Sequence, residues 1–494
     1  EMFPKMQVVC DRANAGQDME RQELYMNLMN RCPGCRRSQC EGCGIYRKLN
    51  TNKHSRISLP EAFVLEPEEG LGISFDVGTT TMAGMLWNLE NGALLNAETA
   101  ANPQAVFGAD VVSRIQAAVL HREQLKEMQR MVIERLDQMA AAMMETENEV
   151  EKGIGKVTIA GNTAMCEILL GILPEGLFRA PFTPDYHEII RLKGRELGFA
   201  FLQKADIIVL PPIGGYVGSD ALMVHSYVSL ERRTQNILSV DIGTNGEILL
   251  QYMGNKYACS TAAGPALEGG AVSQGMRASE GAIGMVSLAG RFPLQDIAVR
   301  AIGGGKARGI CGSGLVDGLS VLYEVGVLEH TGYMRSALEA RKVGTPERIC
   351  KRIEEEAGER RFLLTDSSNP VYLTAGDVRQ LQMSIGAIRA GMETLLTKAG
   401  CEVGQLDAFY LAGAFGCYIS VESAVSIGLL PDMDREKIVQ AGNLAGAGAA
   451  MALLSSKIQE WMDQEKDQII HVELAAESGF QELFLEHMNF PLQF

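Results

Sequence analysis

Apolar residues along this 494-residue chain follow two different spacings, which predict strands and helices in alternation. Short apolar runs bounded by turn residues predict strands at 71–76, 82–89, 156–160, 206–210 and 408–411. Longer segments predict helices at about 109–147, 378–395 and 443–454. For the second helix, Thr374 and Asp377 form a capping box, and Gly400 stands where a C-cap is expected. This alternation is typical of an α/β protein.

One part of the pattern occurs twice. Residues 237–250 repeat the order of residues 73–86: a strand, a turn of the form Asp-hydrophobe-Gly-Thr, and a second strand. The two turn aspartates are Asp76 and Asp241. The repeat predicts a duplicated fold with two similar lobes. The predicted organisation is a four-cysteine module at 1–50, a linker at 51–70, a first lobe at 71–235, a second lobe at 236–470 and a C-terminal tail at 471–494.

The repeated turns carry the first candidate chemistry. A carboxylate at the end of a buried strand needs a partner, and the backbone N–H groups and hydroxyls of a Gly-Thr turn suit phosphate. The carboxylate suits Mg²⁺ bound through water. We therefore predict catalytic roles for Asp76, Asp241 and Glu247, although for Glu247 a structural ion pair explains the sequence equally well. The predicted phosphate-binding residues are Gly78, Thr79, Thr80, Thr81, Gly243, Thr244, Asn245 and Gly246.

These turns resemble the two phosphate motifs of the superfamily of actin, sugar kinases, acetate kinases and heat-shock chaperones. The segment 411–416, Leu-Ala-Gly-Ala-Phe-Gly, resembles the adenosine motif of the same superfamily. The resemblance implies two actin-like (ribonuclease H-like) lobes that bind ATP, with the base and ribose against Gly413, Ala414, Phe415 and Gly416. The chain has no P-loop, the competing route to ATP.

Four further segments make the resemblance closer. They lie at 159–165, 210–220, 259–269 and 309–314, and they resemble motifs of the reductive activators of corrinoid proteins. The resemblance implies an ATP-dependent activase that passes a low-potential electron to the cobalt(II) corrinoid protein of a methyltransferase or O-demethylase system. Cobalt(I) would be restored for methyl transfer. It also implies an upstream electron donor and suggests a homodimer.

A cluster of cysteines stands before the linker, where the sequence departs from the family. Cys32, Cys35, Cys40 and Cys43 have the spacing Cys-x2-Cys-x4-Cys-x2-Cys, whereas well-known members carry a plant-type ferredoxin domain or C-terminal clusters. Four thiolates so close together match the ligands of one 4Fe–4S cluster. The alternative is structural zinc, but zinc ribbons usually separate their two pairs by about 15–20 residues. We therefore favour the 4Fe–4S cluster.

The net charge and the absence of long apolar runs limit which partners and which cell compartment the sequence predicts. The formal net charge is −16, so the chain is expected to repel phosphate backbones and anionic lipid surfaces. No apolar run is long enough to span a bilayer, and the first residues lack the pattern of a secretory signal. These features predict a cytoplasmic protein that binds neither nucleic acid nor membrane.

Three other functions fit parts of the sequence. One is an activator of a 2-hydroxyacyl-CoA dehydratase, although in that family each subunit supplies two cysteines to a shared cluster. The second is a small-molecule kinase with a zinc module, for which no dedicated general-base aspartate stands out. The third is a nucleotide-gated scaffold with zinc at its N-terminus. Metal content separates the last two from both redox functions.

Overall fold

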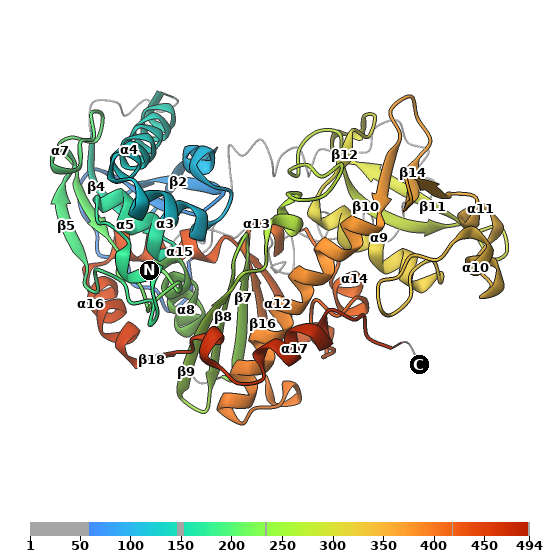
Figure 1. Ribbon diagram of the computed structural model, residues 1–494. Coiled ribbons are helices and arrows are strands. Elements are labelled where there is room, and N and C mark those ends of the chain that lie inside the picture. The colour runs from blue at the N-terminus through green and yellow to red at the C-terminus, as the bar shows by residue number, and fades with distance from the viewer. Residues whose placement is uncertain (1–58, 146–152, 233–234, 417, 493–494) are drawn as a thin grey trace.

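The computed structural model describes residues 59–145, 153–232, 235–416 and 418–492. The predicted four-cysteine module and the first part of the predicted linker lie outside the described residues. Figure 1 shows a first lobe on the left, a second sheet at the lower centre and an inserted region at the upper right. No helix within the described ranges is long and apolar enough to cross a membrane.

The first lobe is built on a six-stranded mixed sheet in the order β3-β2-β1-β4-β6-β5. Its strands are β1 (Leu71–Val77), β2 (Thr81–Asn88), β3 (Leu94–Ala101), β4 (Ile154–Gly161), β5 (Ile190–Lys193) and β6 (Asp206–Val209). Strand β1 pairs antiparallel with β2 and parallel with β4. The apolar runs of β1 and β4 are buried, as expected for central strands with both faces covered.

The second lobe repeats this arrangement in the order β17-β16-β7-β8-β9-β18. Its strands are β7 (Ile237–Ile242), β8 (Gly246–Tyr252), β9 (Asn255–Thr261), β16 (Ala408–Ala412), β17 (Ile438–Gly442) and β18 (Ile469–His471). Strand β7 pairs antiparallel with β8 and parallel with β16, just as β1 pairs with β2 and β4. The duplication predicted from the two Asp-hydrophobe-Gly-Thr turns is confirmed by this topology.

Helices cover both faces of the first sheet. They are α3 (Val111–Leu120), α4 (Arg122–Glu145), α5 (Thr163–Leu170), α6 (Glu175–Phe178), α7 (Gly194–Leu197) and α8 (Ser219–Glu231). The predicted helix at 109–147 is therefore two helices, because α3 ends at Leu120 and α4 begins at Arg122. Helix α4 packs against β2 and β3.

The later helices are α12 (Ala375–Ala399), α13 (Gly413–Gly416), α14 (Val421–Ser426), α15 (Leu444–Leu454), α16 (Ser456–Glu465) and α17 (Phe480–His487). Helix α15 packs against β1, β4 and α8, so a C-terminal segment covers the first sheet. Helix α15 is rich in Gly and Ala and entirely buried, which allows a close approach to its neighbours. Apolar residues of α8, α15 and both sheets share one core.

An inserted region separates β9 from α12. It contains β10 (Ala282–Ala289), β11 (Asp296–Ala301), β12 (Gly309–Ile310), β13 (Ile353–Glu356), β14 (Glu359–Thr365), β15 (Val371–Thr374), α9 (Gly312–Glu324), α10 (Ala337–Lys342) and α11 (Glu347–Cys350).

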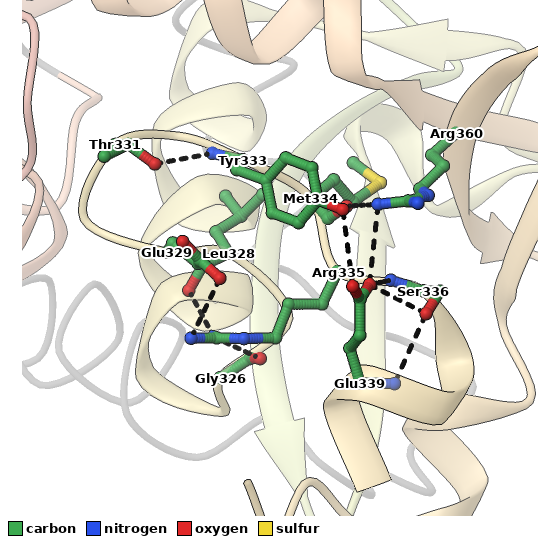
Figure 2. Close-up of polar contacts among 10 residues, drawn as sticks. All are labelled: Gly326, Leu328, Glu329, Thr331, Tyr333, Met334, Arg335, Ser336, Glu339 and Arg360. Atoms are coloured by element: carbon green, nitrogen blue, oxygen red, sulfur yellow. Dashed lines mark hydrogen bonds and ion pairs between the residues drawn. The ribbon is translucent and has the colours of Figure 1, made fainter. Parts of the chain in front are cut away.

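Arg335 ties together the loop between α9 and α10 in this inserted region. Figure 2 shows how Arg335 donates to the carbonyl oxygens of Gly326 and Leu328, at 2.9 and 3.3 Å. Arg335 also lines a cavity of about 310 Å³, and none of the residues that line this cavity belongs to the repeated turns.

The second half of the predicted linker is attached to the lobes. Phe63 is buried in the core shared by the two sheets. The carboxylate of Glu66 accepts hydrogen bonds from the backbone N–H and hydroxyl of Ser456, at 2.6 and 2.8 Å, and pairs with Lys457 Nζ at 3.0 Å. Glu66 therefore satisfies donors at the start of α16. Residues 63–66 of the predicted linker are therefore attached both to the shared core and to the start of α16.

The Glu66→Ala variant is expected to melt at a lower temperature and to be cut faster by protease within residues 59–70. Hydrogen bonds with Ser456 and Lys457 lower the pKa of Glu66 to about 2. The stabilisation is therefore present at pH 7 and disappears as the pH falls from about 4.5 to about 2. Thermal melts of both proteins across this pH range measure it. Glu61→Ala, an exposed carboxylate in the same segment, is the matched control.

Candidate functional site

The first Gly-Thr turn lies between β1 and β2. Asp76 is the second-to-last residue of β1, and the N–H of Gly78 donates to the carbonyl oxygen of Thr81 at 3.1 Å, which closes the turn. A Cβ atom at Gly78 would lie 2.7 Å from that oxygen, so the turn requires glycine there. Asn102, the residue after β3, fixes the turn, since its side-chain Nδ2 donates to the carbonyl oxygen of Gly78 at 2.9 Å.

The second turn has the same form in the second lobe. It runs from Asp241 at the end of β7 to Gly246 at the start of β8, and the N–H of Gly243 donates to the carbonyl oxygen of Asn245 at 2.9 Å. Asp241 stands directly opposite Glu247 in the antiparallel pair, so both side chains lie on one face of the sheet. The structure thus brings together Asp241 and Glu247, the two predicted carboxylates of this lobe.

The two turns meet across the interface between the lobes. The hydroxyls of Thr80 and Thr244 are 2.6 Å apart, and Thr244 donates to a carboxylate oxygen of Glu268 at 2.5 Å. Glu268 ends a short 3-10 helix, Pro265–Glu268, in the loop after β9. Because Thr244 gives its one proton to Glu268, Thr80 is the donor in the threonine pair.

Burial and mutual repulsion raise the pKa values of the carboxylates around these turns. Burial raises the pKa of Asp76 to about 6, against a hydrogen bond from Asn443 Nδ2 at 3.1 Å that lowers it. Burial and the charge of Asp76 raise the pKa of Asp220 to about 7. Burial, followed by the charges of Asp76, Asp220 and Glu268, raises the pKa of Asp241 to about 8. A bound cation would relieve this repulsion.

The arrangement fits Mg²⁺ held largely through water. No group of three or more His, Cys, Asp or Glu side chains within the described ranges converges on one point as a protein-only metal site. Mg²⁺ is usually held by one or two carboxylates together with waters and substrate phosphates. Asp76 and Asp241, one at each turn, are suitable carboxylates for that role.

The predicted adenosine segment borders the second turn. Ala412, at the end of β16, pairs with Asp241, and α13 begins directly after it at Gly413. Gly413 has φ +84°, and a Cβ atom there would lie 2.5 Å from Oδ1 of Asp241. The side chain of Gln440 supports the segment from β17 by donating to the carbonyl oxygen of Gly416 at 2.7 Å.

The structure adds residues that were not among the predicted site residues. Asp220 is the second residue of α8 and ends the segment 210–220 that carries part of the family resemblance, and its carboxylate repels that of Asp76. Asn443 caps α15, and its side chain donates a hydrogen bond to Asp76. Glu268 accepts a hydrogen bond from Thr244. The Nη2 of Arg277 lies 3.4 Å from the carbonyl oxygen of Thr80. Asn443 and Arg277 lie far from the turns in sequence, and no local pattern predicted their contacts. The predicted cluster ligands Cys32, Cys35, Cys40 and Cys43 lie outside the described residues.

Comparisons with known proteins identify related domains over both lobes. The family model described as the C-terminal domain of RACo, the ASKHA domain, matches residues 235–493, and the RACo middle region matches residues 71–233. The corrinoid activation enzyme RamQ of Eubacterium limosum is 33% identical over 426 residues, which cover 85% of this chain and 70% of RamQ. A solved structure of a reductive activator for a corrinoid, iron–sulfur protein matches with a TM-score of 0.76 and 30% identity. It covers 86% of this chain and 67% of that one.

A more distant relative is the [Co(II) methylated amine-specific corrinoid protein] reductase of Methanosarcina barkeri. It is 27% identical over 316 residues, which cover 60% of this chain and 54% of the relative. The chain therefore spans about half the length of this relative. The similarity to the solved activator, extending over both lobes, confirms the predicted actin-like fold.

Proposed function

Because this chain belongs to the RACo family of corrinoid reductive activators, within the ASKHA superfamily, we propose that it is an ATP-hydrolysing activase. Its substrate is the cobalt(II) form of a corrinoid protein in a methyltransferase or O-demethylase system. One electron is transferred to the cobalt, which becomes cobalt(I). The observation that carries the proposal is the pair of Gly-Thr turns, one from each lobe, which meet at Thr80 and Thr244.

In the proposed site, ATP is held by both lobes at once. The backbone N–H groups and hydroxyls of residues 78–81 and 243–246 bind the phosphates. The segment 413–416 holds the adenosine, and Asp76 and Asp241 hold Mg²⁺ through water. Bound Mg²⁺ supplies positive charge that offsets charge on the phosphates. Glu247 lies opposite Asp241 and orients the attacking water. Since the two turns belong to different lobes, hydrolysis changes how strongly the lobes are held together.

ATP is needed because reduction of the corrinoid is energetically unfavourable. For one electron, about 59 mV of unfavourable potential costs about 1.4 kcal/mol. A gap of about 150 mV between the potentials of the donor and the corrinoid therefore costs roughly 3–4 kcal/mol. One conformational change can offset this cost when the corrinoid protein binds one form of the lobes more tightly than the other.

We further propose that Cys32, Cys35, Cys40 and Cys43 hold a 4Fe–4S cluster that delivers the electron. The close spacing of the four thiols supports this proposal. Held by these thiolates, such a cluster would supply one low-potential electron for cobalt(II), and an upstream donor would replace that electron.

Anaerobically purified protein is expected to contain about four irons and four acid-labile sulfides per chain. The Cys32→Ala variant is expected to lose most of both, because one of the four thiolate ligands is removed. Metal and sulfide analysis, with an EPR spectrum after reduction, measures this. Cys401→Ala, which removes a thiol far from the cluster in sequence, is the control. Stoichiometric zinc without a reducible cluster would contradict the redox function.

The test of the whole function is reduction of a cobalt(II) corrinoid protein, followed by the visible spectrum of cobalt(I). Reduced activase is mixed with the corrinoid protein in the presence of Mg-ATP, Mg-ADP or no nucleotide. We expect cobalt(I) to accumulate only with Mg-ATP. Equal yields in all three mixtures would show that nucleotide hydrolysis does not drive the reduction.

A further inference from the structure

The loop after β9 places a cation beside the phosphate turn of the opposite lobe. Arg277 belongs to the second lobe, and its Nη2 donates to the backbone carbonyl oxygen of Thr80 at 3.4 Å. Arg277 thus reaches from the second lobe to the Gly-Thr turn of the first. Arg277 is exposed, and a guanidinium has five N–H donors, so donors remain for a ligand.

The negative charge around the turns favours a cation at this position. Five carboxylates gather there, on Asp76, Asp220, Asp241, Glu247 and Glu268. A triphosphate brought to these turns adds further negative charge, and Mg²⁺ offsets only part of it. A planar guanidinium suits phosphate because it donates two parallel hydrogen bonds.

The loop that carries Arg277 is firmly held. The carboxylate of Asp377, buried at the start of α12, accepts hydrogen bonds from both the backbone N–H and the hydroxyl of Ser273, each at 2.7 Å. The N–H of Met276 donates to the carbonyl oxygen of Ile310 at 2.9 Å. The backbone on both sides of residues 274–275 is thus fixed to α12 and to β12 of the inserted region, which limits where Arg277 can lie.

We propose that Arg277 binds the terminal phosphate of ATP from the second lobe while residues 78–81 bind it from the first. ATP then links the two lobes through this arginine, whereas ADP, which lacks that phosphate, does not. Arg277 is in this way the residue by which the lobes distinguish the two nucleotides. The inference rests on the proposed function, since it requires ATP in this site.

The test compares the affinities of Mg-ATP and Mg-ADP for the full chain by isothermal titration calorimetry. Arg277→Ala is expected to weaken ATP binding about tenfold to a hundredfold, and ADP binding by less than about threefold. Arg277→Lys, which keeps the charge without the paired donors, is expected to recover part of the lost ATP affinity. Arg291→Ala removes an exposed arginine from the β10–β11 turn and is expected to match the wild type for both nucleotides.

The outcomes separate this inference from the proposed function. Unchanged ATP affinity in Arg277→Ala, or equal losses for ATP and ADP, would overturn the role of Arg277 while leaving the ATP site intact. A wild-type chain that binds neither nucleotide would overturn the proposed function and this inference with it. Thermal melts of each variant show whether a loss of affinity comes from unfolding, and a folded Arg277→Ala with a selective loss for ATP supports the role.

Discussion

The Asp241→Asn variant is expected to hydrolyse ATP about a thousandfold more slowly than the wild type. Asp241 is proposed to hold Mg²⁺ through water at the second turn, and it stands opposite Glu247 in the β7–β8 pair. A neutral amide lacks the negative charge that attracts Mg²⁺ and its bound waters, so this role is lost. Steady-state hydrolysis at saturating Mg-ATP measures the change.

Protein stability separates this effect from misfolding. Burial and the charges of Asp76, Asp220 and Glu268 raise the pKa of Asp241 to about 8, so its charged form is disfavoured in the folded chain. A neutral amide removes that repulsion, and the variant is expected to melt at the wild-type temperature or above it. Asp366→Asn, at an exposed position between β14 and β15, is the control for both measurements. Hydrolysis within about threefold of wild type would argue against Asp241 in the site.

Gly312→Ala is expected to lower the free energy of unfolding by about 2–3 kcal/mol and to weaken ATP binding. A Cβ atom at Gly312, the first residue of α9, would lie 1.8 Å from the carbonyl oxygen of Leu267 and 2.8 Å from the ring of Phe415. Leu267 directly precedes Glu268. To relieve the clash, either the loop that carries Glu268 or the proposed adenosine segment, residues 413–416, has to move. Glu268 is the residue that accepts a hydrogen bond from Thr244. Urea unfolding and nucleotide titration measure the two effects.

Gly305→Ala is the matched control in the same region. Gly305 has nothing within 4 Å of its Cβ position and an ordinary φ of −86°. The same methyl group there is expected to leave both stability and ATP affinity near wild type. Equal behaviour of the two variants would show that the contact between α9 and the loop before Glu268 tolerates displacement.

Much of the fold was predictable from local pattern. The helix that begins after Thr374 has the predicted capping box with Asp377, and it ends at Gly400 in the left-handed conformation. The strand at 408–411 and the small-residue helix at 443–454 appear as β16 and α15. These elements could be predicted because caps, turns and apolar spacing act over a few residues.

The site was predictable only where its residues are close in sequence. Asp76 and Asp241 were found because each precedes a Gly-Thr turn and the pattern occurs twice. Asn443 is the opposite case: its side chain bonds to Asp76 across 367 positions of sequence, and by itself it resembles an ordinary helix cap. The assigned roles of the site residues stay predictions until the variants are measured.

The sequence by itself determined the duplicated lobes, the two turns suited to phosphate and the resemblance to corrinoid activators, because each is recognised from the order of residues inside short segments. The tertiary structure decided which segments meet. It placed Thr80 against Thr244, brought Arg277 to the opposite lobe, and fixed Glu66 of the predicted linker to the start of α16. Such contacts arise from packing between distant segments, and no local spacing of residues specifies them.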